Sequence, residues 1–481
     1  MTISQIKALF ANYRAELPGE VQLLFDGLIL LNEQQEKRIQ ELEDKAAKNS
    51  RNSSKPPSSD PPKVKRTKSL RKKSQNKPGG QLGHKGHKLD LSAHPDEVIT
   101  HRLETCPDCG SCLSNEPLEE VIRKQLWDIP PLKVHVLEHQ LEVKTCACCG
   151  NTWQAGGLPS HLRHEVEYGP GIKALSVYLQ CHHHLPLQRS CQLMADVFGL
   201  TISQGSLVNF IQVAHRRLSN FEQGLHTRIL NSAAGHFDET GIRLLKKNFW
   251  LHTASTLKHA LFRIHARRGR QALDDMGILP VYKGVAHHDA YASYLAYENG
   301  EHSLCNAHLL RELTFLEEQH EQKWAGQLKG LLLRIKQSVD RSDTGCVDIR
   351  WQGRYRKAFQ ELLAEGLQAN PPPKKIPGKK GRTAKTKARN LLERLQKHEN
   401  DYLRFMLDPN AAFDNNQAER DLRMNKVKMK ISGCFRSLEA AQAFARIRSL
   451  LVTAQKQSVN VLEALKDVFS PKPVFYLNLI D

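Results

Sequence analysis

The amino-acid sequence predicts a multidomain α+β protein. Its 481 residues exceed the size of one ordinary hydrophobic core, so we expect several domains. Segments with helical periodicity precede and follow a stretch near residues 232–310 in which apolar residues alternate as they do in β-strands. Two Cys-x-x-Cys pairs, Cys106 with Cys109 and Cys146 with Cys149, indicate an additional small metal-binding module.

Positive charge is concentrated in two tracts of the chain. The net charge is +19, of which residues 48–90 contribute +11 and residues 371–390 contribute +8. Two such tracts on an otherwise neutral chain indicate contact with a polyanion. Nucleic acid is the first candidate, because Lys and Arg displace the counterions of phosphates. The alternative is a solvated linker that keeps the protein soluble.

The sequence predicts neither a membrane protein nor a secreted one. No run of eighteen apolar residues occurs, and the N-terminus lacks a basic segment that leads into a long apolar core. We therefore expect a cytoplasmic, nucleoid-associated protein whose eleven cysteines are reduced, with metal rather than disulfides at the paired cysteines.

Residues 18–47 predict a helix, and residues 48–97 a flexible linker. Apolar residues of the helix recur at alternating steps of three and four, as in a coiled-coil seam: Val21, Leu24, Leu28 and Leu31. Gln35 and Arg38 then interrupt the seam, so a short dimeric coiled coil and an amphipathic helix docked on its own chain both remain open. The linker is rich in Ser, Pro, Gly and basic residues, which cannot build a core.

The paired cysteines predict a structural zinc site within residues 98–160. A glycine follows each pair, and the turn that it permits aims backbone N–H groups at the sulfur atoms. Four thiolates close a tetrahedral site, so the expected ligands of one structural Zn²⁺ are Cys106, Cys109, Cys146 and Cys149. Cys112 and Cys148 are spare ligands, and reduced cysteines in surface turns are the alternative to a metal site. Alternation over residues 134–143 predicts a strand between the pairs.

Residues 165–225 predict a helix-turn-helix-like region. Gly199 is placed to end the first helix, and Thr201 or Ser203 to cap the second. An ordinary helical hairpin has the same pattern, so DNA binding by this region is a hypothesis. The histidines of the preceding Cys-His-His-His segment, residues 181–184, are expected to be incidental surface residues rather than metal ligands.

The remainder of the chain predicts a strand-rich part between helical parts. Strands are expected at 233–244, 248–256, 259–266 and 283–288, with a helix near 269–278. Mostly helical structure is expected at 311–412, interrupted by an exposed basic loop, and at 415–469. In the last helical part, one stripe predicts a core face: Phe444, Ile447, Leu450, Leu451 and Ala454.

Three acidic residues are placed to converge on divalent cations. Asp238 lies in the first strand, Asp289 ends a short apolar strand, and Glu419 lies one turn into a later helix. Carboxylate oxygens suit Mg²⁺, and two such ions clamp the attacking and leaving oxygens during displacement at phosphorus. The pattern alone does not select these three from 51 acidic residues, because each also fits a surface carboxylate or a helix cap. Glu239 is expected on the face of its strand opposite to Asp238.

Short motifs in a fixed order carry a resemblance to a known family. They are NSSKPPSSD after the first long helix, KPGGQLGHKGHKL, the two Cys-x-x-Cys pairs, FDET, HHDAYASY, CNAHLLREL and DNNQAERDLR. In this order they resemble the transposases of insertion sequence 66 family elements, of the TnpC type, over nearly the whole chain. One segment, CNAHLLREL, departs from the family pattern, in which an aromatic residue follows the cysteine and a basic residue follows the position of Arg311.

The resemblance implies a ribonuclease-H-like α/β catalytic domain that a helical insertion splits in two. Its catalytic triad, which would also hold two Mg²⁺ or Mn²⁺ ions, is Asp238 in FDET, Asp289 in HHDAYASY and Glu419 in DNNQAERDLR. The side chains implied to support the triad or contact phosphates are His308, Arg311, Arg420 and Arg423. The implied parts of the chain are an N-terminal helix or coiled coil (1–47), a basic linker (48–97), a zinc ribbon-like module (98–160), a helix-turn-helix-like DNA-binding region (165–225), the first part of the catalytic domain (230–310), the helical insertion (311–412), and the second part with C-terminal helices (413–481).

The resemblance also implies a function. The protein would hydrolyse a phosphodiester at each end of an insertion sequence and transfer the freed 3′-hydroxyl into target DNA. Its partners would be the terminal inverted repeats, target DNA, at least a second copy of itself when two ends are paired, and accessory proteins encoded by the element. Two other functions fit the residues: a zinc-containing DNA-binding regulator without catalysis, and a metal-dependent nuclease that cuts without joining.

Overall fold

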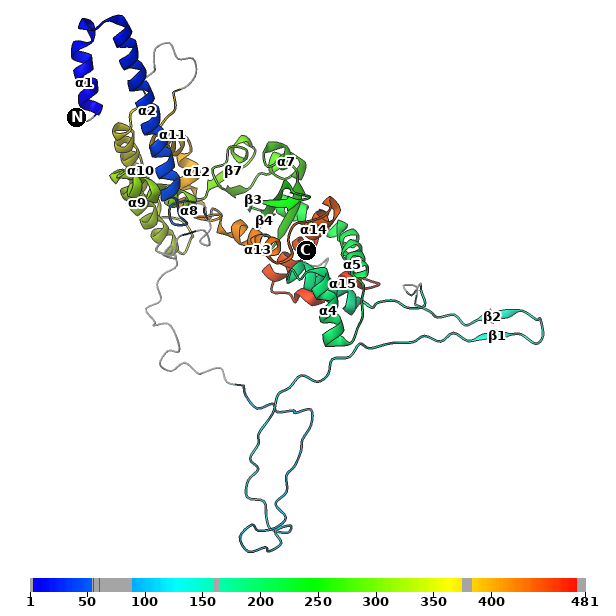
Figure 1. The fold of residues 1–481 in the computed structure, drawn as a ribbon. Helices are drawn as coiled ribbons and strands as arrows, with labels where there is room; N and C mark the ends of the chain where they lie inside the picture. The colour runs from blue at the N-terminus through cyan, green and yellow to red at the C-terminus, as the bar shows by residue number, and fades with distance from the viewer. Residues whose placement is uncertain are drawn as a thin grey trace. The chain divides into compact units, whose positions relative to one another are not determined.

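The computed structural model describes residues 3–53, 55, 60, 89–159, 162, 164–373 and 383–473 (Figure 1). The chain divides into two units, of which the first comprises residues 1–67, 139–193 and 201–481 and the second residues 68–138 with 194–200. Much of the first basic tract, including KPGGQLGHKGHK, and residues 374–382 of the second lie outside the described residues. Among the described residues, no helix has both the length and the apolar character needed to cross a bilayer.

A mixed five-stranded sheet forms the centre of the α/β part of the first unit. In sheet order its strands are β5 (Ala260–His265), β4 (Lys247–Ser255), β3 (Ala234–Leu244), β6 (Val285–His288) and β7 (Glu301–Leu304). Strands β3, β4 and β5 pair antiparallel, whereas β6 and β7 run parallel to β3. The four strands that the sequence predicts are confirmed, and β7 is a fifth that its pattern does not predict.

The hairpin between β3 and β4 closes with a two-residue turn. Leu244 pairs with Lys247, and the two residues between them, Leu245 and Lys246, have positive φ angles of 47° and 65°. Two central residues with positive φ match the twist of the flanking strands, as in type I′ turns, although Asn and Gly are the usual residues there.

The two faces of the sheet are covered differently. Phe237, Ala254 and Leu261 are neighbours across β3, β4 and β5, and they share one buried core with residues of α6 (Ser219–Leu230) and α7 (Arg270–Met276). The next residue along β3, Asp238, points to the other face because side chains alternate along a strand. That face of β3 is contacted by α13 (Asn416–Ser432).

Helix α14 (Leu438–Lys456) covers the outer edge of the sheet. The backbone N–H groups of Ala260 and Phe262 on edge strand β5 donate hydrogen bonds to the hydroxyls of Thr453 (3.1 Å) and Ser449 (2.9 Å). Because these side chains satisfy the unpaired donors of an edge strand, β5 is protected from pairing with another chain. The stripe of the helix predicted as a core face is buried, which confirms that prediction. Helix α15 (Val461–Phe469) follows.

The helices between β7 and α13 form a part with its own core. They are α8 (Asn306–Gln319), α9 (Lys323–Asp340), α10 (Ile349–Ala369), α11 (Lys387–Lys397) and α12 (Glu399–Leu403). Fully buried side chains such as Trp324, Phe359 and Leu392 join them. Gly366 of α10 lets the helices approach closely, since a Cβ there would lie 2.6 Å from Leu392. The helical structure expected here is confirmed, with α8 beginning five residues earlier than the pattern indicates.

The predicted N-terminal helix is also present. Helix α1 (Ile3–Tyr13) packs on α2 (Gly19–Ala47) through stacked rings of Phe10 and Phe25, whose centroids are 5.0 Å apart. Near its C-terminal end, α2 contacts the end of α8 and the start of α11, where buried Asp44 pairs with His320 and Lys387. The seam residues Leu24, Leu28 and Leu31 remain exposed, so association with a second copy stays a prediction.

The predicted helix-turn-helix region contains the expected pair of helices. Helix α4 (Leu187–Phe198) ends at Gly199, which has a positive φ of 64°, and α5 (Gln204–Arg217) begins after Ser203, whose hydroxyl accepts a hydrogen bond from the N–H of Ser206. Gly199 and Ser203 therefore end and cap the helices as predicted. Helix α3 (Pro170–Val177) precedes them and continues into a π-helical turn (Tyr178–His182).

Two expectations for the first half of the chain are wrong. His184, expected at the surface, is buried together with Cys181, because the π-helical turn packs against α14 and α15. The strand predicted over residues 134–143 is absent up to Glu142, and ladder pairing begins only at β1 (Val143–Thr145), which pairs with β2 (Thr152–Gln154). Residues 134–142 alternate in sequence but have no ladder partner among the described residues.

Candidate active site

The parallel pairing of β3 with β6 places two predicted acidic residues side by side. His236 of β3 is the register partner of His287 of β6, so Asp238 stands opposite Asp289, which directly follows β6. The carboxylate of Asp289 accepts a hydrogen bond from the N–H of Tyr291 (3.0 Å), and that of Asp238 accepts one from the N–H of Glu239 (2.8 Å). Residues that follow parallel strands gather at one sheet edge, which is where α/β sheets bind ligands.

The third predicted acid, Glu419, is brought to this edge by Asn415 at the start of α13. The side-chain amide of Asn415 donates to the carbonyl of Phe237 in β3 (2.7 Å), and its oxygen accepts from Nδ1 of His236 (2.9 Å). Its backbone N–H donates to the thiol of Cys305, which directly precedes α8 (3.2 Å). One buried side chain thus joins the starts of α13 and α8 to the strand that carries Asp238.

A pair of stacked histidines supports the segment that leads into α13. The rings of His236 and His287 lie 4.3 Å apart and nearly parallel. Nδ1 of His287 donates to the carbonyl of Gly235 (3.1 Å), and its Nε2 accepts from the N–H of Ala412 (2.8 Å). Burial lowers the pKa of His236 to about 4 and that of His287 to about 3. Both rings are therefore neutral at pH 7 and act as fixed donors and acceptors rather than as cations.

The three carboxylates are close enough to affect one another's charge. Burial raises the pKa of Asp238 to about 8, and the negative charges of Glu239, Asp289 and Glu419 add to the rise. Oε1 of Glu419 is buried and accepts no hydrogen bond from any described residue. Among the described residues, neither Asp238 nor Asp289 forms an ion pair. Carboxylates gathered in this way, with free oxygen atoms, fit divalent cations such as Mg²⁺.

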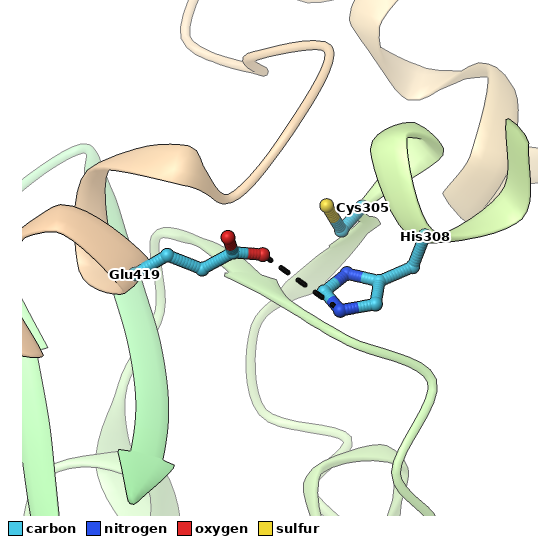
Figure 2. Close-up of side chains that lie close together, drawn as sticks. All are labelled: Cys305, His308 and Glu419. Carbon is cyan, nitrogen blue, oxygen red and sulfur yellow. Dashed lines mark ion pairs between the residues drawn. The ribbon is translucent and has the colours of Figure 1, made fainter. Parts of the chain in front are cut away.

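Cys305 and His308, at the start of α8, complete the surroundings of Glu419. Figure 2 shows the carboxylate of Glu419 directed at the His308 ring, and Nε2 of His308 lies 3.7 Å from its Oε1. One potential ligand atom from each of Cys305, His308 and Glu419 lies within 4.8 Å of the other two. Burial raises the pKa of the Cys305 thiol to about 12, so at neutral pH His308 and Glu419 are the better metal ligands of this group.

Cys305 was not among the residues selected from the sequence, although a signal for it exists. Cys305 and His308 are three residues apart where a helix begins, and that spacing places both on one side of the first turn. The four residues predicted to support the triad differ in their contacts. His308 lies beside Glu419, whereas no ion pair among the described residues joins Arg311, Arg420 or Arg423 to the three acids. The side chains of Arg420 and Arg423 are exposed.

Glu239 takes the opposite direction from Asp238, as the strand alternation predicts. Its side chain is only 2% exposed and accepts hydrogen bonds from Nε of Arg268 (2.7 Å) and from the hydroxyl of Tyr294, a residue of the core beneath the sheet. Because these partners occupy Glu239, it is a structural neighbour of the acidic cluster. Arg268 is the second residue at the site that the sequence patterns do not select.

The two cysteine knuckles have the same local geometry. In the first, the N–H of Cys106 donates to the carbonyl of Ser111 (2.8 Å), and Gly110 has a φ of 74°. Hydrogen bonds from Ser111, and from the Cys106 thiol, lower the pKa of Cys109 to about 7. Thiolates are the form that binds zinc, so this knuckle is prepared for metal.

In the second knuckle, the N–H of Cys146 donates to the carbonyl of Asn151 (2.8 Å), and Gly150 has a φ of 72°. The backbone N–H groups of Cys149 and Cys148 point at the Cys146 sulfur and lower the pKa of its thiol. The turn geometry that the glycines predict is confirmed in both knuckles. Each knuckle thus carries one thiol whose pKa is lowered, Cys109 in the first and Cys146 in the second, and thiolates suit structural zinc.

Comparison with known families covers most of the chain. The sequence model of the Transposase IS66 family matches residues 165–443, which is more than half of the chain. A model described as the zinc-finger binding domain of transposase IS66 matches residues 104–150, the segment with both knuckles. A family of unknown function (DUF6444) matches residues 9–90. No curated protein matches the chain.

Proposed function

The chain belongs to the IS66 family of transposases, and we propose that it cuts and joins DNA with Asp238, Asp289 and Glu419 as its catalytic carboxylates. The observation that carries the proposal is the convergence of three acids from separate elements: burial raises the pKa of Asp238 to about 8, and the charges of Glu239, Asp289 and Glu419 add to the rise. A structural fold needs no such cluster, because unpaired buried carboxylates are unfavourable. Perturbed carboxyl groups at a sheet edge are typical of functional sites.

The three carboxylates are the proposed ligands of two Mg²⁺ or Mn²⁺ ions. The fit rests on hard oxygen donors that lack other partners, above all the buried Oε1 of Glu419. When bound, the cations would supply Lewis-acid stabilisation of the attacking and leaving oxygens. His308, 3.7 Å from Glu419, is placed to orient that carboxylate. The zinc-finger domain holds a structural Zn²⁺ and takes no part in the chemistry.

The proposed reaction has two displacements at phosphorus. Water attacks the phosphorus at the element's end, the bond to the 3′-oxygen breaks, and the element is left with a free 3′-hydroxyl. That hydroxyl then attacks a target phosphodiester, so that one P–O bond forms and another breaks. The protein contributes positioning rather than a covalent intermediate, and Asp238 and Asp289 suit this role because paired strands hold their backbones rigidly.

DNA is the partner of a transposase with a zinc-finger domain. We further propose that the zinc module, the α4–α5 pair and the basic tracts hold the terminal repeats. Pairing two element ends needs at least two copies of the chain, for which the exposed seam of α2 is a candidate contact. The proposed compartment is the cytoplasm, at the nucleoid, and accessory proteins of the element are proposed further partners.

The proposal is tested with labelled DNA that carries the element's ends, incubated with protein and Mg²⁺. Cutting followed by strand transfer supports it, and hydrolysis without transfer identifies a nuclease instead. Binding without cutting identifies a regulator. The variant Asp289→Asn is expected to abolish both steps while DNA affinity stays within about twofold, and Asp343→Asn, an exposed carboxylate, serves as the control. Unchanged activity of Asp289→Asn overturns the assignment.

A further inference from the structure

Arg268 lies beside the acidic cluster and is held from several sides. It belongs to the loop between β5 and α7. Its Nε donates to the buried carboxylate of Glu239 (2.7 Å), and its guanidinium lies 5.0 Å from the ring centre of Trp250 and 4.4 Å from that of Tyr291. A cation over aromatic rings and a charged hydrogen bond fix the guanidinium in one orientation.

Arg268 is coupled to the acidic cluster through its two nearest contacts. Glu239 directly follows Asp238, and the N–H of Tyr291 donates to the carboxylate of Asp289 (3.0 Å). Arg268 is near enough to Asp289 for the charge of that carboxylate to favour its cationic form. Two of the residues that hold Arg268, Glu239 and Tyr291, therefore lie within two residues of Asp238 and Asp289 in the sequence.

The terminal nitrogens of Arg268 are available to a ligand. The side chain is 42% exposed, and within the described part of the chain no acceptor lies at hydrogen-bonding distance from Nη1 or Nη2. A guanidinium held by Nε, with both terminal nitrogens open, presents a fork that matches two oxygens of one phosphate. An arginine whose terminal nitrogens donate hydrogen bonds to protein acceptors, by contrast, has no such fork to offer a ligand.

We propose that Arg268 binds a DNA phosphate next to the scissile phosphodiester and that Glu239, Trp250 and Tyr291 hold it in position for this contact. The proposal rests on the proposed function, because it needs a DNA strand at the carboxylates. The acidic residues at the site repel a polyanion, and a fixed cation beside them offsets that repulsion where the strand enters.

The test compares Arg268→Gln with Arg267→Gln in the full-length protein with Mg²⁺. Arg267 is the preceding residue in the same loop, is exposed, and has no side-chain hydrogen bond or ion pair within the described part of the chain. Both variants lose one positive charge, so a general charge effect is the same in both. Loss of a contact that positions the strand lowers the cleavage rate by about 10²-fold, which we expect for Arg268→Gln, and about twofold or less is expected for Arg267→Gln.

A second measurement identifies the phosphate itself. Single phosphates within two nucleotides of the cleavage position are replaced, one at a time, by neutral methylphosphonates. At the contacted phosphate, we expect the replacement to slow the wild-type protein but not Arg268→Gln, because the contact is already lost in the variant. A merely structural role for Arg268 would leave the same sensitivity in both proteins at every position.

The outcomes separate this inference from the proposed function. If the wild-type protein cuts DNA and Arg268→Gln behaves like Arg267→Gln, the phosphate contact is refuted and the carboxylate assignment stands. If the wild-type protein does not cut DNA and Asp289→Asn binds DNA as tightly as the wild-type protein does, the proposed function is refuted, whatever the result for Arg268. Equal melting temperatures of Arg268→Gln and Arg267→Gln exclude loss of folding as the cause of a low rate. Arg268→Lys keeps the positive charge but not the two terminal nitrogens of the fork, so it is expected to recover only part of the rate.

Discussion

Replacing Asp238 by Asn is expected to stabilise the metal-free protein at alkaline pH. The folded protein keeps a proton on Asp238 up to about pH 8, whereas the unfolded chain releases it near the ordinary value of 3.8. Between these values the folded state binds more protons than the unfolded state, so the free energy of unfolding falls as pH rises and levels off above pH 8. Asparagine has no charge to bury and removes this dependence.

The size of the effect follows from the same two pKa values. The difference between 3.8 and about 8 corresponds to an upper limit of roughly 6 kcal/mol at pH 9. We expect about 1–3 kcal/mol to be observed, because counterions and relaxation around the three acids reduce the penalty. For a unit of this size that amounts to a rise in melting temperature of about 2–10 °C for the Asn variant.

The assay is thermal unfolding of full-length protein in chelator, at pH 5 and at pH 9, with and without Mg²⁺. The Asn variant is expected to exceed wild type in melting temperature by much more at pH 9 than at pH 5, because most of the loss in the wild-type free energy of unfolding falls between these pH values. Mg²⁺ at pH 9 is expected to stabilise wild type and close the gap, since a ligand of the folded state raises its stability. Asp343→Asn controls for loss of one exposed negative charge. An Asn variant no more stable than wild type at pH 9 would refute the argument.

Three further perturbations test other parts of the structure. Asn415→Ala is expected to slow catalysis about 10²-fold, because Glu419 loses its anchor to β3. Asn416→Ala removes only a local hydrogen bond to Asp414 and is expected to leave the rate within about threefold. Equal rates of the two variants would contradict the positioning role. Cys109→Ser is expected to release the one bound zinc per chain, as measured by elemental analysis, and full retention of zinc would exclude it as a ligand. Lys246→Gly is expected to raise the free energy of unfolding in urea by about 0.5–1 kcal/mol, because Lys246 has a φ of 65°, and a loss would contradict the strained turn.

Local patterns predict most of the elements around the site. Alternation places β3, β4, β5 and β6 within two residues of their observed bounds. Strand β7 has four residues, Glu-His-Ser-Leu, and gains its identity from pairing with β6, which no local pattern records. Residues 134–142 show the opposite case: their sequence alternates as in a strand, but they have no ladder partner within the described part of the chain.

Residues of the candidate site that lie in recognisable motifs can be predicted from the sequence, whereas residues that only the folded chain brings to the site cannot. The resemblance of the motifs implies Asp238, Asp289 and Glu419 as the triad, and in the structure Asp289 and Glu419 lie near enough to Asp238 for their charges to raise its pKa; that the three act together in catalysis is our proposal. The spacing of Cys305 and His308, three residues apart at the start of a helix, also indicates Cys305 as a residue of the site. No local pattern predicts Arg268, because its role depends on Trp250 and Tyr291, which are 18 and 23 residues away in the sequence and meet it only after β4 and β6 pair with β3.

The most direct measurement of the central claim is a crystal structure of the protein soaked with Mn²⁺, with the metal located by its anomalous scattering. We predict manganese within about 2.5 Å of carboxylate oxygens from Asp238, Asp289 and Glu419, and its loss from the Asp289→Asn variant under the same conditions. Anomalous density confined to the zinc knuckles or to surface acids, with none at this edge of the sheet, would contradict the account.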